Sequence, residues 1–422
     1  MKFARWETLE NLKELINLSK VNGKEKIKKS GLPIAYDNEN LYIDSRNGHS
    51  LIIGSNGSGK TQAITLPMLN LAWLASESII VSDSSDELYE TTSEKFKENG
   101  YNIIRINFDE AINTHCWNPF EIVKKHYDEK NFDKVSDELE SIANYLLNGI
   151  EEVNSDPFWI NSAISYFTGI SLYILSIGKA LNLDEIYDTN NVIKENPDKF
   201  IKSLDKHSSA YINLASILTA PNDTRMSIIS VFDNKFKLFF GRENLKKLLS
   251  KSDFDINRIS EEKNVIYIKA GKTKISDHLL PLFIEQVYET KNDVNKLNII
   301  IDEFYNLNPI ADFSKMLNYS RSVNICFTIL IRGFNDLKNT YGKEETDIIK
   351  LNFSNIVYLL SQDNETLEEI SNMCGYKSKD DALISVEDLK TLKQFEAIIL
   401  TTRMMPFKTR MLPYYEIELN EK

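Results

Sequence analysis

The segment GSNGSGKT, which begins at Gly54, follows the apolar run SLII and constrains the fold more than any other feature of this chain. Gly54, Gly59, Lys60 and Thr61 satisfy the pattern G-x-x-x-x-G-K-[ST], and Gly57 adds a further glycine inside it. Glycines allow positive φ and a close approach of backbone N–H groups to an anion. The motif lies between an apolar strand and the plausible helix TQAITLPMLNLAWLA. The sequence therefore predicts a phosphate-binding loop, rather than a glycine-rich turn with a chance lysine.

Each residue of such a loop has an expected role. Lys60 is expected to reach the β- and γ-phosphates, and the Thr61 hydroxyl to ligate Mg²⁺. The cofactors predicted on this basis are ATP and Mg²⁺. The predicted nucleotide contacts are Gly54, Ser55, Asn56, Gly57, Ser58, Gly59, Lys60, Thr61 and Gln62.

Strand and helix patterns alternate on both sides of a purely helical stretch. SIIVSD and YNIIRINF are predicted strands that flank the helix SDELYETTSEKFKENG. NVIYIKA, LNIIID, NICFTILIR, NIVYLL and EAIILTT are predicted strands farther along the chain. From about Asp133 to Lys251 helical spacing prevails and strand signals are nearly absent. Because alternating strands and helices build a parallel sheet, we expect an α/β fold with an all-α insertion.

These patterns give the expected domains. We expect a RecA-like P-loop NTPase domain with a mostly parallel sheet, which the all-α domain interrupts. LPIAYDNENLYID is predicted to form a hairpin before the loop. The predicted limits are 1–30 for an N-terminal helical segment, 31–132 and 252–422 for the NTPase domain, and 133–251 for the all-α domain.

A phosphate loop also needs a carboxylate for Mg²⁺ at the end of a neighbouring strand and a group that activates water. IIRINFDE and NIIIDEF both end in an acidic pair. An arginine and an asparagine interrupt the first run, whereas the second has three successive isoleucines, as a strand buried on both faces requires. We therefore assign Asp302 to Mg²⁺ and Glu303 to water activation, in preference to Asp109 and Glu110.

Two further residues keep two interpretations each. Asp83 ends the strand IIVSD, and it either lies near the phosphates or caps the following helix. Arg321, in MLNYSRSVNI, is either a solvated surface arginine or a catalytic arginine that a ring ATPase supplies across a subunit interface.

Composition limits the remaining possibilities. The net charge of −12 over 422 residues argues against indiscriminate nucleic-acid binding, although a local basic channel stays possible. Basic clusters such as KEKIKK are typical of solvated faces, so no DNA-contacting residue is assigned. Three cysteines without metal spacing predict a reducing cytosol. PFWINSAISYFTGISLYILSIG is long enough to span a bilayer, but its polar residues favour a buried core helix.

With these residues placed, the sequence resembles the type IV secretion coupling proteins, the TraG/TraD-class conjugative DNA-transfer ATPases. The resemblance runs from about residue 30 to residue 416. Its motifs are HSLIIGSNGSGKT, IIVSDSSDELYE, CWNPF, DPFWINSA, IIIDEF, LKNTYGKEETDIIKLNF and MMPFKTRMLPYYE. Lys60, Thr61, Asp302 and Glu303 match family positions, and Arg321 matches a family arginine implicated in the subunit interface.

The resemblance implies an ATP-driven motor that delivers relaxase-bound single-stranded DNA or protein to a secretion channel. Its active form is expected to be a hexameric ring, and the chain in isolation is either a monomer or an oligomer. Its implied partners are single-stranded DNA, relaxase and relaxosome proteins, the channel ATPases and a separate membrane-anchoring protein. Most members begin with transmembrane helices, and we expect a soluble member, or a shortened chain, at the cytoplasmic inner face of the cell membrane. Residues 1–30 are either the docking segment for the anchoring protein or a solvated helix.

The chain departs from the family at Arg332, in FTILIRGF, where members carry a glutamine that senses the γ-phosphate. Arg332 is expected to act as a catalytic residue that senses the phosphate in place of the neutral glutamine. Two other functions stay open, and the arginine at position 332 is the feature that favours the second of them. One is a double-stranded DNA translocase of the segregation or resection type, which shares the ring and the loop but lacks the DPFW helical insertion. The other is a weakly hydrolysing, nucleotide-gated scaffold that docks substrates.

Overall fold

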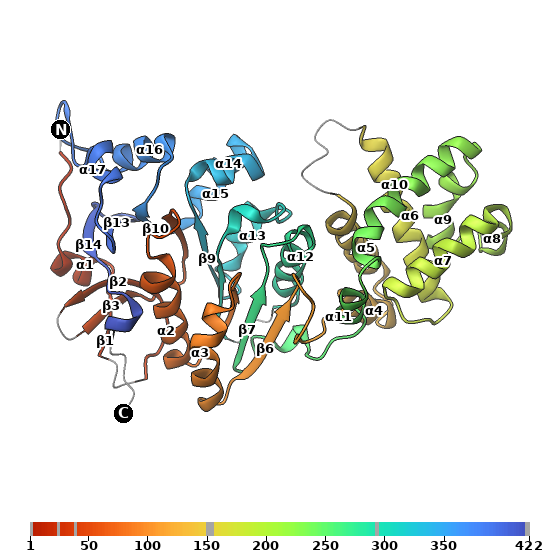
Figure 1. The fold of residues 1–422 in the computed structure, drawn as a ribbon, viewed down its shortest axis with the longest axis horizontal. Helices are drawn as coiled ribbons and strands as arrows, with labels where there is room; N and C mark the ends of the chain where they lie inside the picture. Colours follow the sequence, from red (N-terminus) through yellow and green to blue (C-terminus); the bar gives the residue numbers. More distant parts are fainter. Residues whose placement is uncertain (1–2, 23–25, 38–39, 149–155, 292–294, 418–422) are drawn as a thin grey trace. The chain divides into compact units, whose positions relative to one another are not determined.

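The computed structural model describes residues 3–22, 26–37, 40–148, 156–291 and 295–417 (Figure 1). By its internal contacts the chain divides into two compact units. Unit 1 holds Met1–Ile104, Asn257–Ile268 and Tyr288–Lys422, and unit 2 holds Arg105–Ile256 and Lys269–Val287. Each unit is therefore assembled from segments that are far apart in the sequence.

A nine-stranded, mostly parallel sheet organises unit 1, and the division between the units falls within its last two strands. Neighbours from β10 to β7 run parallel, whereas β13 and β14 add two antiparallel strands at one edge. In sheet order the strands are β14 (Phe407–Arg410), β13 (Glu396–Thr401), β10 (Phe353–Leu360), β4 (His49–Gly54), β9 (Ile325–Ile331), β8 (Leu297–Ile301), β5 (Ser78–Ser82), β7 (Asn264–Lys269) and β6 (Asn102–Asn107). Every strand predicted from an apolar run is present.

The apolar runs explain the central position of these strands. Every residue of β4, β8 and β9 is buried, as strands covered on both faces require. The chain passes from β4 to β5 through α2 (Leu66–Ala75), and in the opposite direction from β8 to β9 through α13 (Phe313–Ser320). Because parallel crossovers are right-handed, these two helices cover opposite faces. The direction in which the connections cross the sheet therefore reverses between β4 and β9. Open α/β sheets bind ligands at such a point, next to the carboxyl ends of the strands.

The other helices of unit 1 follow the same alternation. The predicted helix after β5 is α3 (Glu87–Glu98), and Gly100, with φ of +75°, follows its end. Towards the C-terminus unit 1 contains α14 (Phe334–Tyr341), α15 (Lys343–Leu351), α16 (Asn364–Cys374), α17 (Val386–Lys390) and the short hairpin of β11 (Tyr376–Ser378) and β12 (Asp381–Ala382).

A second, three-stranded antiparallel sheet precedes the phosphate loop. β2 (Leu32–Asp37) pairs with β3 (Asn40–Asp44), which confirms the predicted hairpin. The prediction that residues 1–30 are helical is wrong for most of that segment. Among the described residues of this segment only α1 (Leu9–Leu15) is helical, and β1 (Ser19–Val21) pairs with β3 instead. Asn17, with φ of +52°, turns the chain after α1, and the free edge of β3 supplies hydrogen bonds that a solvated helix would lack.

Unit 2 is built from helices. They are α4 (Glu121–Asp128), α5 (Phe132–Leu147), α6 (Pro157–Ser176), α7 (Leu183–Glu195), α8 (Pro197–Ser203), α9 (Ser209–Leu218), α10 (Asn222–Phe240), α11 (Glu243–Leu248) and most of α12 (Lys274–Thr290). The unit is larger than the predicted insertion at 133–251. Trp117 explains the difference, because its indole packs against Phe108 and against Phe283 of α12 and so joins flanking segments to the helical core.

The uncharged segment of unit 2 forms α6, the one described helix that is long and apolar enough to cross a membrane by length and composition. In its most apolar window 61% of the residues are buried inside the protein. Tyr166, Phe167 and Ile170 are fully buried, and the Tyr166 hydroxyl donates to the Asn190 side chain at 2.9 Å. These contacts agree with the predicted core helix.

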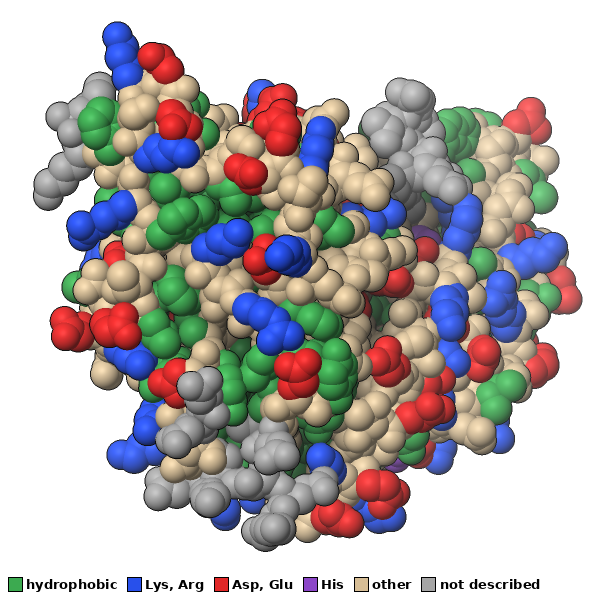
Figure 2. Space-filling model, turned by 60° about the vertical axis from the view of Figure 1, so that its left-hand side comes forward, with side chains coloured by type: hydrophobic (Ala, Val, Ile, Leu, Met, Phe, Trp, Pro, Cys, Tyr) green, Lys and Arg blue, Asp and Glu red, His purple; other side chains and the backbone are tan. Residues whose placement is uncertain are grey.

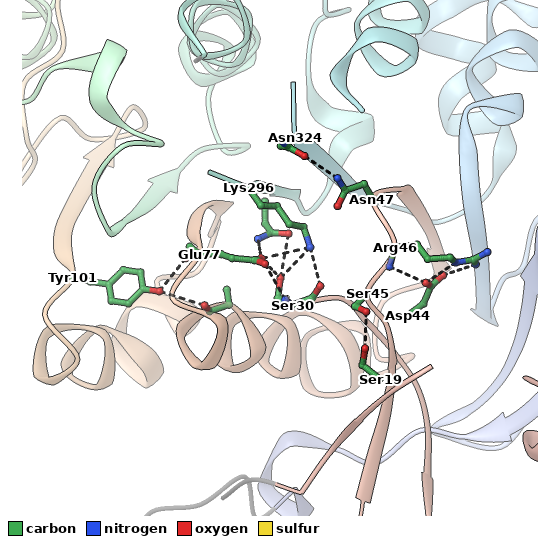
Figure 3. A network of polar contacts seen from close by, with 12 residues as sticks. Ser19, Ser30, Asp44, Ser45, Arg46, Asn47, Glu77, Tyr101, Lys296 and Asn324 are labelled. Carbon is green, nitrogen blue, oxygen red and sulfur yellow. Dashed lines mark hydrogen bonds and ion pairs between the residues drawn. The ribbon is translucent and has the colours of Figure 1, made fainter. Parts of the chain in front are cut away.

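A buried polar network closes the amino-terminal edge of the sheet in unit 1 (Figure 3). Glu77 immediately precedes β5 and Lys296 immediately precedes β8, and their charged groups lie 3.5 Å apart. The Glu77 carboxylate also accepts from the Ser30 N–H at 3.0 Å and from the Asn298 amide at 2.8 Å. Lys296 donates to the Ser30 carbonyl at 2.8 Å. The network fixes the chain that enters β2 onto the sheet.

Candidate active site at the phosphate loop

The loop after β4 has the backbone that its glycines predict. Gly57 has φ of +78° and Gly59 has φ of +91°, both in the region that favours glycine. A Cβ atom on Gly59 would lie 2.6 Å from the ring of Phe395, whereas one on Gly57 would meet no atom within 4 Å. Gly59 is therefore required by close packing as well as by φ, and Gly57 faces open space that an anion can enter.

A helix begins directly at the end of the loop. Thr61 and Gln62 start a π-helical turn, Thr61–Thr65, which continues into α2. The Ala63 N–H donates to the Gly59 carbonyl at 2.8 Å, and the Gln62 amide donates to the Glu87 carboxylate at 3.2 Å. The loop thus ends at a helix N-terminus, the position where backbone N–H groups favour phosphate.

Lys60 is partly buried beside groups of both charges. Its ammonium donates to the Gly54 carbonyl at 2.6 Å and to the Ser55 carbonyl at 3.4 Å. Burial lowers the pKa of Lys60, and the carboxylates of Asp302 and Glu303 oppose that shift. Lys60 forms no ion pair within the described residues. Its charge is held by neutral carbonyls, which an anionic ligand can supplement.

Ser58 is the unsatisfied group of the loop. The side chain is 5% exposed, and its hydroxyl has no hydrogen-bond partner among the described residues. A buried hydroxyl without a partner is unfavourable unless a ligand atom completes it. Hydroxyl, carboxylate and ammonium groups together match the donors and acceptors that a nucleotide with Mg²⁺ requires. The residues present therefore fit this cofactor.

The acidic pair follows β8 at the same edge of the sheet. The Asp302 N–H donates to the Ser82 hydroxyl at 2.7 Å, and the Glu303 N–H donates to the Asp302 carboxylate at 2.9 Å. Burial raises the pKa of Asp302, and the nearby Lys60 ammonium opposes the rise. Glu303 has φ of +51°, a strained value for a side chain that is not glycine.

Arg332 follows β9, between the loop and the acidic pair. Its guanidinium lies 3.7 Å from the centre of the Tyr305 ring and 3.0 Å from the Asp336 carboxylate. Arg332 and Asp336 line a cavity of about 390 Å³ together with Ser55, Asn56, Gly333, Asn335, Ser361, Gln362 and Asp363. The structure thus brings Lys60, Asp302, Glu303 and Arg332 into one site.

Arg321 lies at the opposite edge of the sheet. It ends α13, just before β9 begins, and its guanidinium donates to the Asn352 carbonyl just before β10. The strands run parallel from this edge to the phosphate loop, so Arg321 does not reach the loop of its own chain. A catalytic role for Arg321 requires a second copy.

The other candidate carboxylates are engaged elsewhere. Asp109 belongs to unit 2, where it accepts from the Ser276 hydroxyl at 2.8 Å and from the Thr273 hydroxyl at 3.1 Å. Asp83 follows β5 and accepts from the Tyr89 N–H in α3 at 2.9 Å, as a residue at the start of a helix does. Burial raises the pKa of Asp83. The contacts of Asp83 favour the helix-capping interpretation.

Sequence analysis missed Tyr305 and Asp336. Asp336 lies four residues after Arg332, at the spacing of a helical ion pair, which is a signal that the sequence contains. Tyr305 lies in the turn after Glu303, and burial raises the pKa of its hydroxyl to about 12. Nothing local marks Tyr305, because its contact with Arg332 joins two loops that are distant in sequence.

The site combines a buried strand, the glycine-rich loop that carries Lys60, and an acidic pair at the end of a second strand. On a sheet with this strand order, these parts define a RecA-like P-loop NTPase fold. A family model described as Type IV secretory system Conjugative DNA transfer matches residues 3–382, and the chain belongs to this family. No curated protein matches the chain by sequence.

Solved structures show the same fold. The bacterial conjugative coupling protein TrwBdeltaN70, in its unbound monoclinic form, is 15% identical with a TM-score of 0.73, over 97% of this chain and 94% of that chain. The plasmid coupling protein TrwB in complex with the ATP analogue ADPNP gives 15% and 0.70 over the same shares. VirB4 of Thermoanaerobacter pseudethanolicus is 11% identical with a TM-score of 0.59, over 90% of this chain and 96% of that chain.

Proposed function

We propose that this chain binds and hydrolyses ATP with Mg²⁺, and that it couples hydrolysis to delivery of relaxase-bound single-stranded DNA or protein to a type IV secretion channel. The observation that carries the proposal is the convergence of Lys60, Asp302 and Glu303 at the carboxyl edge of the sheet. TrwB, which shares the fold, has been solved with ADP and Mg²⁺. The family membership supports the transfer role.

Each side chain has a role that its surroundings support. Lys60 binds the β- and γ-phosphates, Thr61 and Asp302 hold the metal ion, and Glu303 orients and deprotonates the attacking water. When bound, Mg²⁺ neutralises charge on the phosphates. Ser58, whose hydroxyl has no partner among the described residues, supplies a further contact to the ligand. The backbone N–H groups from Ser55 to Gly59 surround the phosphate.

The working form that we propose is a homo-hexamer. Arg321 reaches a phosphate loop only from a neighbouring subunit, because it lies at the opposite edge of its own sheet. Tyr319, Ile348 and Leu351 lie on α13 and α15, close in sequence to Arg321 and Asn352, and they are 61%, 49% and 84% exposed. Exposed apolar side chains of this size favour burial in an interface. The same arrangement predicts little activity from an isolated monomer.

The proposed partners are single-stranded DNA, a relaxase, the channel ATPases and a membrane-anchoring protein. On the face shown in Figure 2 acidic and basic side chains are interspersed, and the described residues form no continuous basic stripe there. This distribution favours a few contacts in a channel over binding across the surface. We place the protein at the cytoplasmic face of the membrane.

The test is the ATPase rate per subunit against protein concentration, with and without single-stranded DNA. We expect the rate to rise with both, and Glu303→Gln to lower turnover by about a hundredfold or more while ATP still binds. Arg321→Ala should abolish the rise with concentration, whereas Arg410→Ala, another exposed arginine of unit 1, should keep it.

Other outcomes select the alternatives. Stimulation by duplex DNA, with no preference for single strands, would favour a double-stranded DNA translocase. A slow rate that neither DNA nor Glu303→Gln changes would favour a nucleotide-gated docking scaffold. A wild-type chain that binds no nucleotide would refute the proposed function itself.

A further inference from the structure

We infer that Asp336 and Tyr305 are positioning residues for Arg332, and that the Asp336 carboxylate compensates the arginine charge beside the phosphates. The inference rests on the proposed nucleotide site and deepens it. It explains how this chain accommodates an arginine at a place where a neutral side chain would also fit. Three residues form this group, which is called the Arg332 clamp: Tyr305, Arg332 and Asp336.

The Asp336 carboxylate holds Arg332 through both of its oxygens. One oxygen accepts from the Arg332 backbone N–H at 2.8 Å and from Nε at 3.4 Å. The other accepts from Nη2 at 3.0 Å. The Asp336 side chain is 12% exposed and the Arg332 side chain is 49% exposed. A two-oxygen contact with a guanidinium sets its orientation as well as its charge.

The ring of Tyr305 supports the face of the same guanidinium. The two groups lie 3.7 Å apart, a distance typical of cation–π stacking. Tyr305 follows Glu303 by two residues, so the stack connects Arg332 to the loop that carries the proposed water-activating residue. On the other side, the Ser361 hydroxyl donates to the Arg332 carbonyl at 2.7 Å. These contacts fix the backbone of Arg332, together with one edge and one face of its guanidinium.

The remaining edge of the guanidinium is available to a ligand. Nη1 makes no hydrogen bond within the part of the chain that the structure describes. Arg332, Asp336 and the loop residues Ser55 and Asn56 line the same cavity. An arginine has five N–H donors in a planar fork, so one edge can contact Asp336 while the other contacts a phosphate oxygen.

The two charges of the clamp act in opposite directions on the site. Arg332 lowers the pKa of Lys60, and Asp336 raises it. Removal of the arginine alone would leave a carboxylate facing the phosphates of a bound nucleotide. A neutral glutamine at position 332 is therefore expected to work only when Asp336 is neutral as well. A carboxylate that only capped α14 would show no such dependence.

The experiment is a double-mutant cycle on the full chain, read as the dissociation constant of a non-hydrolysable ATP analogue. We expect Arg332→Gln to weaken binding about tenfold, because a charge-assisted contact is lost and Asp336 is left unpaired. Asp336→Asn in addition should restore binding to within about threefold of wild type. The matched control combines Arg332→Gln with Asp381→Asn, which removes an exposed aspartate paired with Lys377 at 3.2 Å in the β11–β12 hairpin. This double variant should bind the analogue no more tightly than Arg332→Gln alone. Equal binding by Arg332→Gln with and without Asp336→Asn would overturn the inference.

Tyr305 provides a second, independent readout. Tyr305→Phe keeps the ring and Tyr305→Leu removes it, so turnover should be about tenfold lower in Tyr305→Leu than in Tyr305→Phe, with little difference in KM. Equal turnover in Tyr305→Leu and Tyr305→Phe would contradict the role of the ring. Lys60→Ala distinguishes failure of the inference from failure of the proposed function. If Lys60→Ala abolishes binding but the clamp variants match wild type, only the inference fails. If Lys60→Ala binds like wild type, the proposed function fails.

Discussion

The two edges of the parallel sheet in unit 1 each hold a lysine, buried at one edge and partly buried at the other, and they satisfy its charge differently. At the amino-terminal edge Lys296 pairs with Glu77 and donates to Ser30. At the carboxyl edge Lys60 donates to two backbone carbonyls and has no ion pair within the described residues. The first lysine has its counter-charge in place, whereas the second is compensated only at a distance, by Asp302 and Glu303 and more weakly by Asp336.

The polar atoms around each lysine show the same difference. At the amino-terminal edge the Asn298 amide donates to Glu77 at 2.8 Å, and the Tyr101 hydroxyl donates to the Glu77 carbonyl at 3.0 Å (Figure 3). At the carboxyl edge the Ser58 hydroxyl is buried without a partner among the described residues. Satisfied networks make a fold rigid, whereas a buried hydroxyl without a partner favours a ligand atom that completes it. The comparison therefore assigns stability to one edge and binding to the other.

The largest expected effect comes from the buried ion pair. Lys296→Met should leave the Glu77 carboxylate buried without a cation and lower the free energy of unfolding by about 3–5 kcal/mol. Urea denaturation of the full chain measures this loss. Glu77→Gln in the same chain should recover much of it, because the amide can still accept from the Ser30 N–H.

The matched control is Lys60→Met at the other edge. Burial lowers the pKa of Lys60, so removal of the charge should not reduce stability, although it should abolish nucleotide binding. If the two lysine substitutions destabilise the chain equally, the distinction between the edges is wrong.

His49, at the amino-terminal end of β4, is expected to give the next largest effect. Its Nδ1 accepts from the Phe327 N–H at 3.0 Å, and its Nε2–H therefore donates to the Leu317 carbonyl at 2.7 Å. Burial lowers the pKa of His49 to about 4. Because the folded-state pKa lies below the unfolded value, the stabilisation is complete above about pH 6.5 and is lost as pH falls towards 4, up to about 3 kcal/mol.

The measurement is the free energy of unfolding of wild type and of His49→Gln at a series of pH values from about 4.5 to about 7.5. The variant should show a shallower loss of stability towards acid. His207→Gln, on the surface of unit 2, serves as the control. Parallel pH dependences for wild type and His49→Gln would contradict a neutral, buried His49.

The sequence predicted what depends on local pattern. Apolar runs such as Ile299–Ile301 mark buried strands, and the glycine spacing marks the loop, because both are set by residues that are adjacent in the chain. The structure confirms the strands and places Asp302 beside Lys60. The helical prediction for residues 1–30 failed at β1, since a three-residue edge strand forms only when its partner strand lies beside it.

Contacts between distant segments were beyond the sequence. Glu77 and Lys296 are separated by more than two hundred positions, and no local spacing relates them. The same holds for the stack of Arg332 on Tyr305, which depends on how two loops meet. Only Asp336 could have been found in advance, because it follows Arg332 at a helical spacing.

The smallest expected effect tests the unsatisfied hydroxyl of the phosphate loop. Ser58→Ala should change the free energy of unfolding without nucleotide by less than about 1 kcal/mol, because the hydroxyl has no partner to lose. The increase in Tm on addition of ATP and Mg²⁺ should be smaller in the variant, because a ligand that binds less tightly stabilises less. Ser82→Ala is the matched control, since its hydroxyl accepts from the Asp302 N–H at 2.7 Å and its loss should destabilise the chain even without nucleotide. If Ser58→Ala destabilises the nucleotide-free chain as much as Ser82→Ala, the Ser58 hydroxyl serves the fold, and the contrast between the two edges loses one of its supports.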